Sequence, residues 1–318
     1  MRATKSPDME ADPASECGLR SDAISDRETS RPAPAAVAGR DWWLSVSERL
    51  TLGSAVGAIG MEPTKVRTSA GEVTVTATDY GTGTPYIILH GGAGPASVSR
   101  FAEMLGASGN ARAIVPVHPG FQGTSRPEGL NTITGLAEVY AAWTDALGLQ
   151  NTVVVGNSIG GWIAAELALR QNPRIRRLIL VDAGGLKIEA HPAPDVFALS
   201  LDQISQMSYR DPSKFRIDPS RMTDQQRAAV AGNRAALKLY GGPEMADPTL
   251  LRRLHEVRVP TLVVWGAADR MIPREHGEAF ASSIAGARLE IFEDAGHLPQ
   301  LEAPEHLLRV VKGFAGGS

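Results

Sequence analysis

The chain has 318 residues, of which 43% are hydrophobic and 21% are charged, and its formal net charge is −3. This length suffices for one large domain, or for a core with a lid. The balanced charge gives no reason to expect nucleic acid or an anionic membrane as a partner. No apolar run is long enough to span a membrane. A single cysteine, Cys17, excludes an internal disulfide and a zinc site of several cysteines, which fits a cytoplasmic location.

The first 60 residues differ in composition from the rest and are expected to form a disordered or loosely packed extension. Residues 1–40 lack apolar periodicity, so they bury too little surface to offset the entropy of ordering. They also lack the apolar segment of a secretory signal. Residues 41–60 are more apolar and have three interpretations: a helix packed on the domain, a membrane anchor, or a segment ahead of a functional domain that begins at Met61.

From Met61 onward, short apolar runs alternate with helix-like segments. The pattern predicts helices over 132–147, 161–170 and 301–314, and strands over 73–78, 86–89, 111–117, 152–155, 175–181, 261–265 and 289–292. Buried strands that alternate with helices are typical of a mostly parallel twisted sheet covered on both faces. The predicted class is therefore α/β, with a core formed by residues 61–184 and 251–318.

Residues 185–250 break this rhythm. They contain short amphipathic pieces, several prolines and no strong strand signal. We expect them to form a helical lid, or cap, over the carboxyl edge of the sheet, because ligands of open α/β sheets bind at that edge.

The strongest local pattern is VVVGNSIGG at 153–161, an apolar strand followed by G-x-S-x-G and a helix. A sharp turn from strand to helix needs small residues on both sides of the serine, because chain segments come close there. It also places the serine at a helix N-terminus, where unpaired N–H groups favour negative charge. Ser158 is the expected nucleophile, and the alternative interpretation is a plain turn.

A serine nucleophile needs a base and a group that orients the base. Of the seven histidines, His297 lies in a loop directly after a strand, where side chains that act on substrate are usually presented. The acid has two candidates, Asp269 after the strand at 261–265 and Asp182 at the end of the strand at 175–181. We favour Asp269, but both satisfy the chain order Ser, Asp, His.

The third requirement is a pair of N–H donors for an oxyanion. The strand at 86–89 ends in HGGAGP, where glycines let main-chain N–H groups approach a substrate. The second donor is expected to be the N–H of Ile159, while His90 is expected to be structural. A phosphate-binding loop is the poorer alternative, because G-x-G-x-x-G is absent.

Five motifs in order resemble those of α/β-hydrolase-fold enzymes: HGGAGP at 90–95, HPGFQGTSRP at 118–127, GNSIGG at 156–161, WGAADRMIP at 265–273 and AGHLPQLEAPE at 295–305. The resemblance implies the α/β-hydrolase fold, the triad of Ser158, Asp269 and His297, an oxyanion hole formed by Gly92 and Ile159, and a lid. GNSIGG and the H-x-x-Q at 297–300 are also similar to C–C bond hydrolases of meta-cleavage products.

The expected activity is hydrolysis of small to medium carboxylesters through an acyl-enzyme. The alternatives are C–C bond hydrolysis of the meta-cleavage type and a non-catalytic ligand-binding protein on the same fold. No cofactor and no metal are expected, and the partner is a small-molecule substrate, with homo-oligomer formation left open. The residues expected to contact the substrate are Ala93, Asn157, Phe197, Met207 and Leu298.

Overall fold

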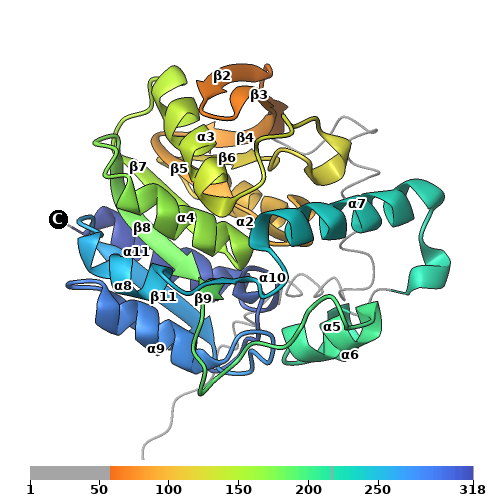
Figure 1. The fold of residues 1–318 in the computed structure, drawn as a ribbon. Coiled ribbons are helices and arrows are strands. Elements are labelled where there is room, and N and C mark those ends of the chain that lie inside the picture. Colours follow the sequence, from red (N-terminus) through yellow and green to blue (C-terminus); the bar gives the residue numbers. More distant parts are fainter. Residues whose placement is uncertain (1–57, 216–217, 318) are drawn as a thin grey trace, which may run out of the picture. The chain divides into compact units, whose positions relative to one another are not determined.

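The computed structural model describes residues 58–215 and 218–317. The predictions for residues 1–57 concern residues outside this range. The central feature is an eight-stranded sheet with the order β1-β4-β6-β5-β7-β8-β11-β12 (Figure 1). Its strands are β1 (Ala58–Gly60), β4 (Ala77–Thr82), β5 (Thr84–Leu89), β6 (Ala111–Pro116), β7 (Thr152–Asn157), β8 (Ile175–Val181), β11 (Thr261–Gly266) and β12 (Arg288–Phe292).

The sheet is mostly parallel, as the sequence predicted. Only β1 and β4 run antiparallel to their neighbours, whereas β6, β5, β7, β8, β11 and β12 are paired in parallel. A separate hairpin of β2 (Thr64–Thr68) and β3 (Gly71–Val75) precedes β4. The parallel strands need helical crossovers, which cover both faces of the sheet.

Two layers of helices enclose the sheet. On one face lie α3 (Ile133–Ala146), α4 (Ile159–Leu169) and α9 (Arg274–Ser283), whose buried side chains form the larger apolar cluster. On the other face lie α2 (Ala96–Ala107) and α11 (Pro304–Gly316), which form the second cluster. The helix predicted over 301–314 is divided into α10 (Pro299–Glu302) and α11, because a proline starts the second helix and disfavours helical backbone before it.

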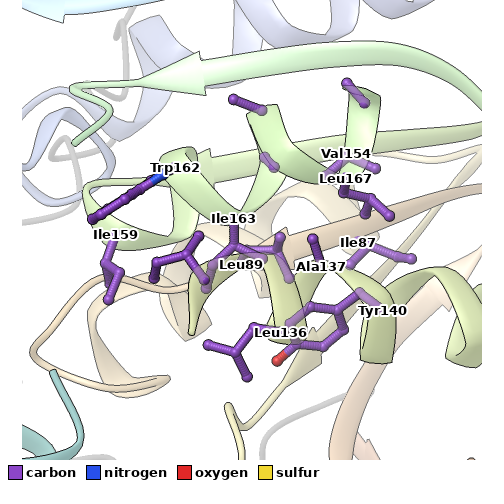
Figure 2. Close-up of a cluster of buried hydrophobic side chains, with 14 of the residues drawn as sticks. Ile87, Leu89, Leu136, Ala137, Tyr140, Val154, Ile159, Trp162, Ile163 and Leu167 are labelled. Atoms are coloured by element: carbon purple, nitrogen blue, oxygen red, sulfur yellow. The ribbon is translucent and has the colours of Figure 1, made fainter. Parts of the chain in front are cut away.

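The central strands are apolar on both faces because both faces are covered. In β5, Ile87 and Leu89 belong to the larger cluster, while Tyr86 and Ile88 belong to the second one. Figure 2 shows Ile87 and Leu89 among side chains of α3 and α4, including Tyr140. Such burial stabilises the fold by about 25 cal/mol per Å² of apolar surface.

Residues 185–250 are inserted between β8 and β11, and their own elements are mostly helical. They comprise β9 (Gly185–Leu186), α5 (Leu201–Ser208), α6 (Pro212–Phe215), a 3-10 turn η2 (Pro219–Arg221), α7 (Asp224–Gly241) and β10 (Ala246–Asp247), followed by α8 (Leu250–Arg253) and η3 (Leu254–Glu256). Capping boxes at Ser200 and Thr223 fix the starts of α5 and α7.

The two ends of this insertion meet. Strands β9 and β10 pair in parallel, a feature that the sequence did not predict. Beside them, Arg253 forms ion pairs with the buried Glu166 of α4 and with Asp247. The insertion therefore leaves and re-enters the core at one fixed place. In the part of the chain that the structure describes, no helix has the length and apolar character required to cross a membrane.

Candidate active site

Ser158 lies in the turn between β7 and α4 with a backbone φ of 57° and ψ of −122°. A positive φ is costly for a residue other than glycine and is found mostly where function requires it. The flanking glycines permit the turn: a Cβ on Gly156 would lie 2.2 Å from the Gly160 carbonyl oxygen, and one on Gly160 would lie 2.2 Å from that of Leu89. The Ser158 side chain is partly exposed at this turn.

The predicted base and acid are in contact. His297 Nδ1 lies 2.8 Å from Asp269 Oδ2, and both side chains are buried. The other carboxylate oxygen of Asp269 accepts hydrogen bonds from the N–H groups of Met271 (2.8 Å) and Ile272 (3.0 Å). These donors stabilise the ionised carboxylate. Since Nδ1 is hydrogen-bonded to Asp269, Nε2 is the ring nitrogen of His297 that is left for proton transfer.

Asn157 connects the serine turn to the loop of His297. Its side-chain N–H₂ donates to the main-chain carbonyls of Val181 (3.2 Å) and His297 (3.1 Å), and its oxygen accepts a hydrogen bond from Gln300 (3.1 Å). Only 3% of Asn157 is exposed. Its amide is therefore committed to the protein interior, which differs from the substrate contact expected from the sequence.

A buried aromatic network fixes the loop that follows β5. The main-chain N–H of His118 donates to the ring nitrogen Nε2 of His90 (3.2 Å). The proton of the His90 ring is therefore on Nδ1, which donates it to the Gly91 carbonyl (2.7 Å). His118 Nε2 donates to the His90 carbonyl (2.9 Å), and its Nδ1 then accepts from the Tyr140 hydroxyl. Each group has one consistent role when both rings are neutral.

Burial keeps these histidines uncharged. It lowers the pKa of His118 to about 4, and burial together with the neighbouring His118 lowers the pKa of His90 well below its ordinary value. The network therefore supports the expected structural role of His90. It holds the glycine loop without placing a charge beside the serine turn.

The two predicted oxyanion donors lie on opposite sides of Ser158 in sequence, and the structure brings their loops together. A Cβ on Gly91 would lie 3.2 Å from Ser158 Cβ, so the glycine loop passes directly against the serine. Ile159 is the first residue of α4, where main-chain N–H groups have no partner within the helix. A Cβ on Gly92 would lie 2.9 Å from Leu237 of α7. The pairing of Gly92 and Ile159 as donors stays a prediction.

The remaining predicted contact residues are spread over several elements. Ala93 is exposed, and its carbonyl accepts a hydrogen bond from Asn233. Phe197 packs against the cationic side chains of Arg234 and Lys238, each 5.7 Å from the ring centre. The Met207 carbonyl accepts from the Arg270 N–H, and Leu298 is buried just before α10.

The insertion contacts the glycine loop through α7; we call this the glycine-loop contact and define it by Asn233, Leu237 and Tyr240. Asn233 is buried and bridges two loops, since it accepts from the Gln122 N–H (2.8 Å) and donates to the Ala93 carbonyl (3.3 Å). The Tyr240 hydroxyl donates to the Pro119 carbonyl (2.8 Å). All these polar groups are neutral.

The insertion contacts the His297 loop at the end of α5; we call this the histidine-loop contact and define it by Ser208, Arg270 and Glu302. The His297 N–H donates to the Ser208 carbonyl (2.7 Å). The Glu302 carboxylate accepts from three main-chain N–H groups, those of Gly296 (2.7 Å), Arg210 (2.9 Å) and Asp211 (3.4 Å). The Arg270 guanidinium donates to the carbonyls of Gln206 and Tyr209. Sequence reasoning missed these residues, because their partners are distant in the chain.

Asp182, Asp269 and His297 are the candidate group for a metal ion within the described ranges. One oxygen of each carboxyl group and one ring nitrogen lie within 4.8 Å of one another, and all three residues are buried. Two of these donors are already joined, because His297 Nδ1 is hydrogen-bonded to Asp269. An ion would have to break that bond.

A parallel sheet with a strained serine turn and a buried Asp–His pair at the ends of its strands defines the class of α/β hydrolases. Comparison with known proteins gives the family: the profile of the Alpha/beta hydrolase family matches residues 86–309. The chain belongs to this family, and it is a hydrolase.

Its curated relatives include a 2-hydroxy-6-oxo-6-phenylhexa-2,4-dienoate hydrolase of Burkholderia cepacia, 31% identical over 74% of this chain and 89% of the relative. A 2-hydroxy-6-oxononadienedioate hydrolase of Burkholderia vietnamiensis is 30% identical over 76% of this chain and 91% of the relative. Among solved structures, an esterase from Thermogutta terrifontis has a TM-score of 0.66 and 25% identity, covering 80% of this chain and 98% of that one.

A meta-cleavage product hydrolase from Pseudomonas fluorescens has a TM-score of 0.65 at 23% identity, covering 80% of this chain and 97% of that one. This likeness shows the fold alone. The relatives and structures thus include both C–C bond hydrolases and esterases.

Proposed function

We propose that the chain is a serine hydrolase that cleaves small to medium carboxylesters through an acyl-enzyme. The observation that carries the proposal is the buried His297–Asp269 pair, 2.8 Å apart, whose loop is tied by Asn157 to the turn of Ser158. A base oriented by a carboxylate beside a strained serine is the arrangement that nucleophilic acyl transfer needs.

In this mechanism His297 Nε2 takes the proton of the Ser158 hydroxyl as its oxygen attacks the substrate carbonyl. Asp269 keeps the imidazole in the required tautomer and stabilises the imidazolium that forms. The N–H groups of Gly92 and Ile159 hold the oxyanion. The leaving group departs with the proton from His297, and a water activated by His297 then releases the acid and restores Ser158.

We also propose that residues 185–250 act as the lid of this site. Support comes from its two contacts with the loops that carry the proposed oxyanion donor and base. The apolar side chains of Phe197 and Met207 then limit the acyl or alcohol part of the ester.

The test is turnover of p-nitrophenyl esters of increasing acyl length, together with labelling by a fluorophosphonate probe. Wild type is expected to hydrolyse short and medium esters and to be labelled. Ser158→Ala is expected to lose both properties while it keeps the same melting temperature. Absence of labelling and turnover in the folded wild type would contradict the proposal and favour a ligand-binding protein.

C–C bond hydrolysis of a dienoate is the second candidate, because the relatives at about 30% identity are named for that reaction. A dienoate carries a carboxylate that a guanidinium would hold. Two arginines of the insertion already bind groups of the protein. The Arg234 guanidinium donates to the carbonyls of Val196, Phe197 and Leu199. The Arg227 guanidinium donates to the Met222 carbonyl and to the Asp224 carboxylate.

The same purified protein should therefore be offered a 2-hydroxy-6-oxo-dienoate beside the ester, and kcat/KM should be compared. The ester proposal expects the larger value for the ester. A much larger value for the dienoate would replace it with the C–C reaction while leaving the triad in place.

A further inference from the structure

Asp182 is a second acid next to the proposed catalytic pair, and the mechanism above does not use it. It follows β8 directly and is fully buried. Its backbone φ is 44°, a conformation that is costly for a side chain other than glycine, asparagine or aspartate. Aspartate tolerates this conformation, but an acid that is fully buried needs partners for its polar atoms, so its surroundings indicate its role.

The two acids differ in the donors that surround them. Asp269 accepts three hydrogen bonds, from His297 and from the N–H groups of Met271 and Ile272. Asp182 accepts one, from the Gly266 N–H (2.9 Å), and its Oδ2 is buried without a hydrogen-bond partner. Asp269 is therefore surrounded by more hydrogen-bond donors than Asp182.

The two carboxyl groups are also close to each other. One oxygen of each, with a ring nitrogen of His297, lies within 4.8 Å of the others in a buried site. Two like charges at this separation strongly disfavour one another. The charge of Glu302 also disfavours a negative charge on Asp182.

We propose that Asp182 is protonated at neutral pH and that its Oδ2–H donates a hydrogen bond to the Asp269 carboxylate, so that the two acids carry one negative charge between them. Asp182 is then a positioning residue: it orients Asp269 toward His297 and supplies no charge of its own.

The direction of the pKa shift agrees. Burial, first, and then the charge of Asp269 raise the pKa of Asp182 well above its ordinary value. The effect on turnover rests on the proposed triad, but the protonation itself can be measured without any substrate.

The direct test is an infrared difference spectrum between wild type and Asp182→Asn at pH 7. We expect the C=O stretch of a protonated carboxylic acid in wild type only. Its absence would overturn the proposal, whatever reaction the protein catalyses. Failure of the ester proposal would instead appear as absent turnover with the band still present.

The kinetic test compares Asp182→Asn with Asp182→Gly. Asparagine tolerates the positive φ, accepts from the Gly266 N–H and donates to Asp269, so kcat and the acidic limb of kcat/KM should be unchanged. Glycine also tolerates the backbone but has no donor, so kcat should fall about tenfold with KM unchanged. If Asp182 were ionised, Asp182→Asn would move the acidic limb to lower pH by roughly 1–3 units, which would overturn the proposal.

Discussion

The insertion contacts the two sides of the candidate site by different chemistry. At the glycine-loop contact, Asn233 and Tyr240 use neutral polar groups, and the loop behind them is held by the uncharged ring of His118. At the histidine-loop contact, the charged groups of Glu302 and Arg270 bind main-chain N–H and carbonyl groups. The fixed Asp–His pair lies beside the second contact.

Because of this difference, the contributions of the two contacts to the free energy of unfolding should change with pH in opposite directions. A fold that keeps buried histidines neutral loses stability when the pH falls, because the unfolded chain takes up the protons. A fold that raises the pKa of a carboxyl group is instead stabilised when that group is protonated. The comparison can be tested with variants of the proposed catalytic pair and of each contact.

The largest effect is expected from Asp269→Asn, which removes the carboxylate that is hydrogen-bonded to His297. The amide would favour the wrong tautomer of His297, so kcat for a p-nitrophenyl ester should fall by about 10⁴. The fold should be kept, because the side chain keeps its shape, and circular dichroism and the melting temperature check this. An active Asp269→Asn variant together with an inactive Asp182→Asn variant would contradict this prediction and show that Asp182 is the acid that orients His297.

The next effect concerns acid stability at the glycine loop. The pKa of His118 is about 4 in the fold and 6.5 when unperturbed, because burial disfavours its charged form. Its contribution is therefore complete above pH 6.5 and is lost as the pH falls toward 4; the shift corresponds to about 3 kcal/mol.

The measurement is the free energy of unfolding by urea at several pH values between 4 and 7, for wild type and His118→Gln. Glutamine can still donate to the His90 carbonyl and does not titrate, so the variant should lose about 3 kcal/mol less over this window than wild type. The residual slope reports the other groups whose pKa the fold shifts, among them His90, His276 and Glu302. Equal slopes for the two proteins would show that His118 does not titrate in this range.

A smaller effect is expected from Asn233→Ala, which breaks the glycine-loop contact. The Gln122 N–H and the Ala93 carbonyl would lose their partner, at a cost of about 1–3 kcal/mol in the free energy of unfolding. The proposed catalytic pair is not touched, so KM should rise more than kcat falls. The comparison variant is Asn233→Asp, which keeps the acceptor for Gln122, loses the donor to Ala93 and adds a carboxyl group at this buried position. If both variants have the same kinetics, the change in KM results from loss of the hydrogen bond that Asn233 donates to the Ala93 carbonyl.

These contacts also mark what the sequence could and could not predict. The apolar run at 175–181 predicted β8 to the residue, and the glycines around Ser158 predicted its turn, because both signals are local. The helix α2 was not predicted, although Val98, Phe101 and Leu105 form its buried stripe. Its signal was local too, but the preceding glycine-rich segment was interpreted only as a loop.

The partners of the site residues could not be predicted, because they depend on which loops meet in space. Asn157 was expected to face the substrate, yet its amide is hydrogen-bonded to Val181, 24 residues away, and to His297 and Gln300, which are 140 and 143 residues away. The choice between Asp269 and Asp182 was open for the same reason: both follow adjacent parallel strands, and only the folded loops show which of them contacts His297.

The smallest effect is expected at the histidine-loop contact, from Glu302→Gln. Burial raises the pKa of Glu302 above its ordinary value, even though three N–H donors oppose the shift. The contribution of this group is thus fully present below the ordinary pKa of a glutamate and is lost as the pH rises through the raised value. Glutamine does not titrate, so the stability of the variant relative to wild type should improve as the pH rises from 4 to 7, opposite in sign to the glycine-loop contact. Urea unfolding over the same pH series as for His118→Gln measures this, and a relative stability that falls with rising pH would show that both contacts respond to protons in the same way.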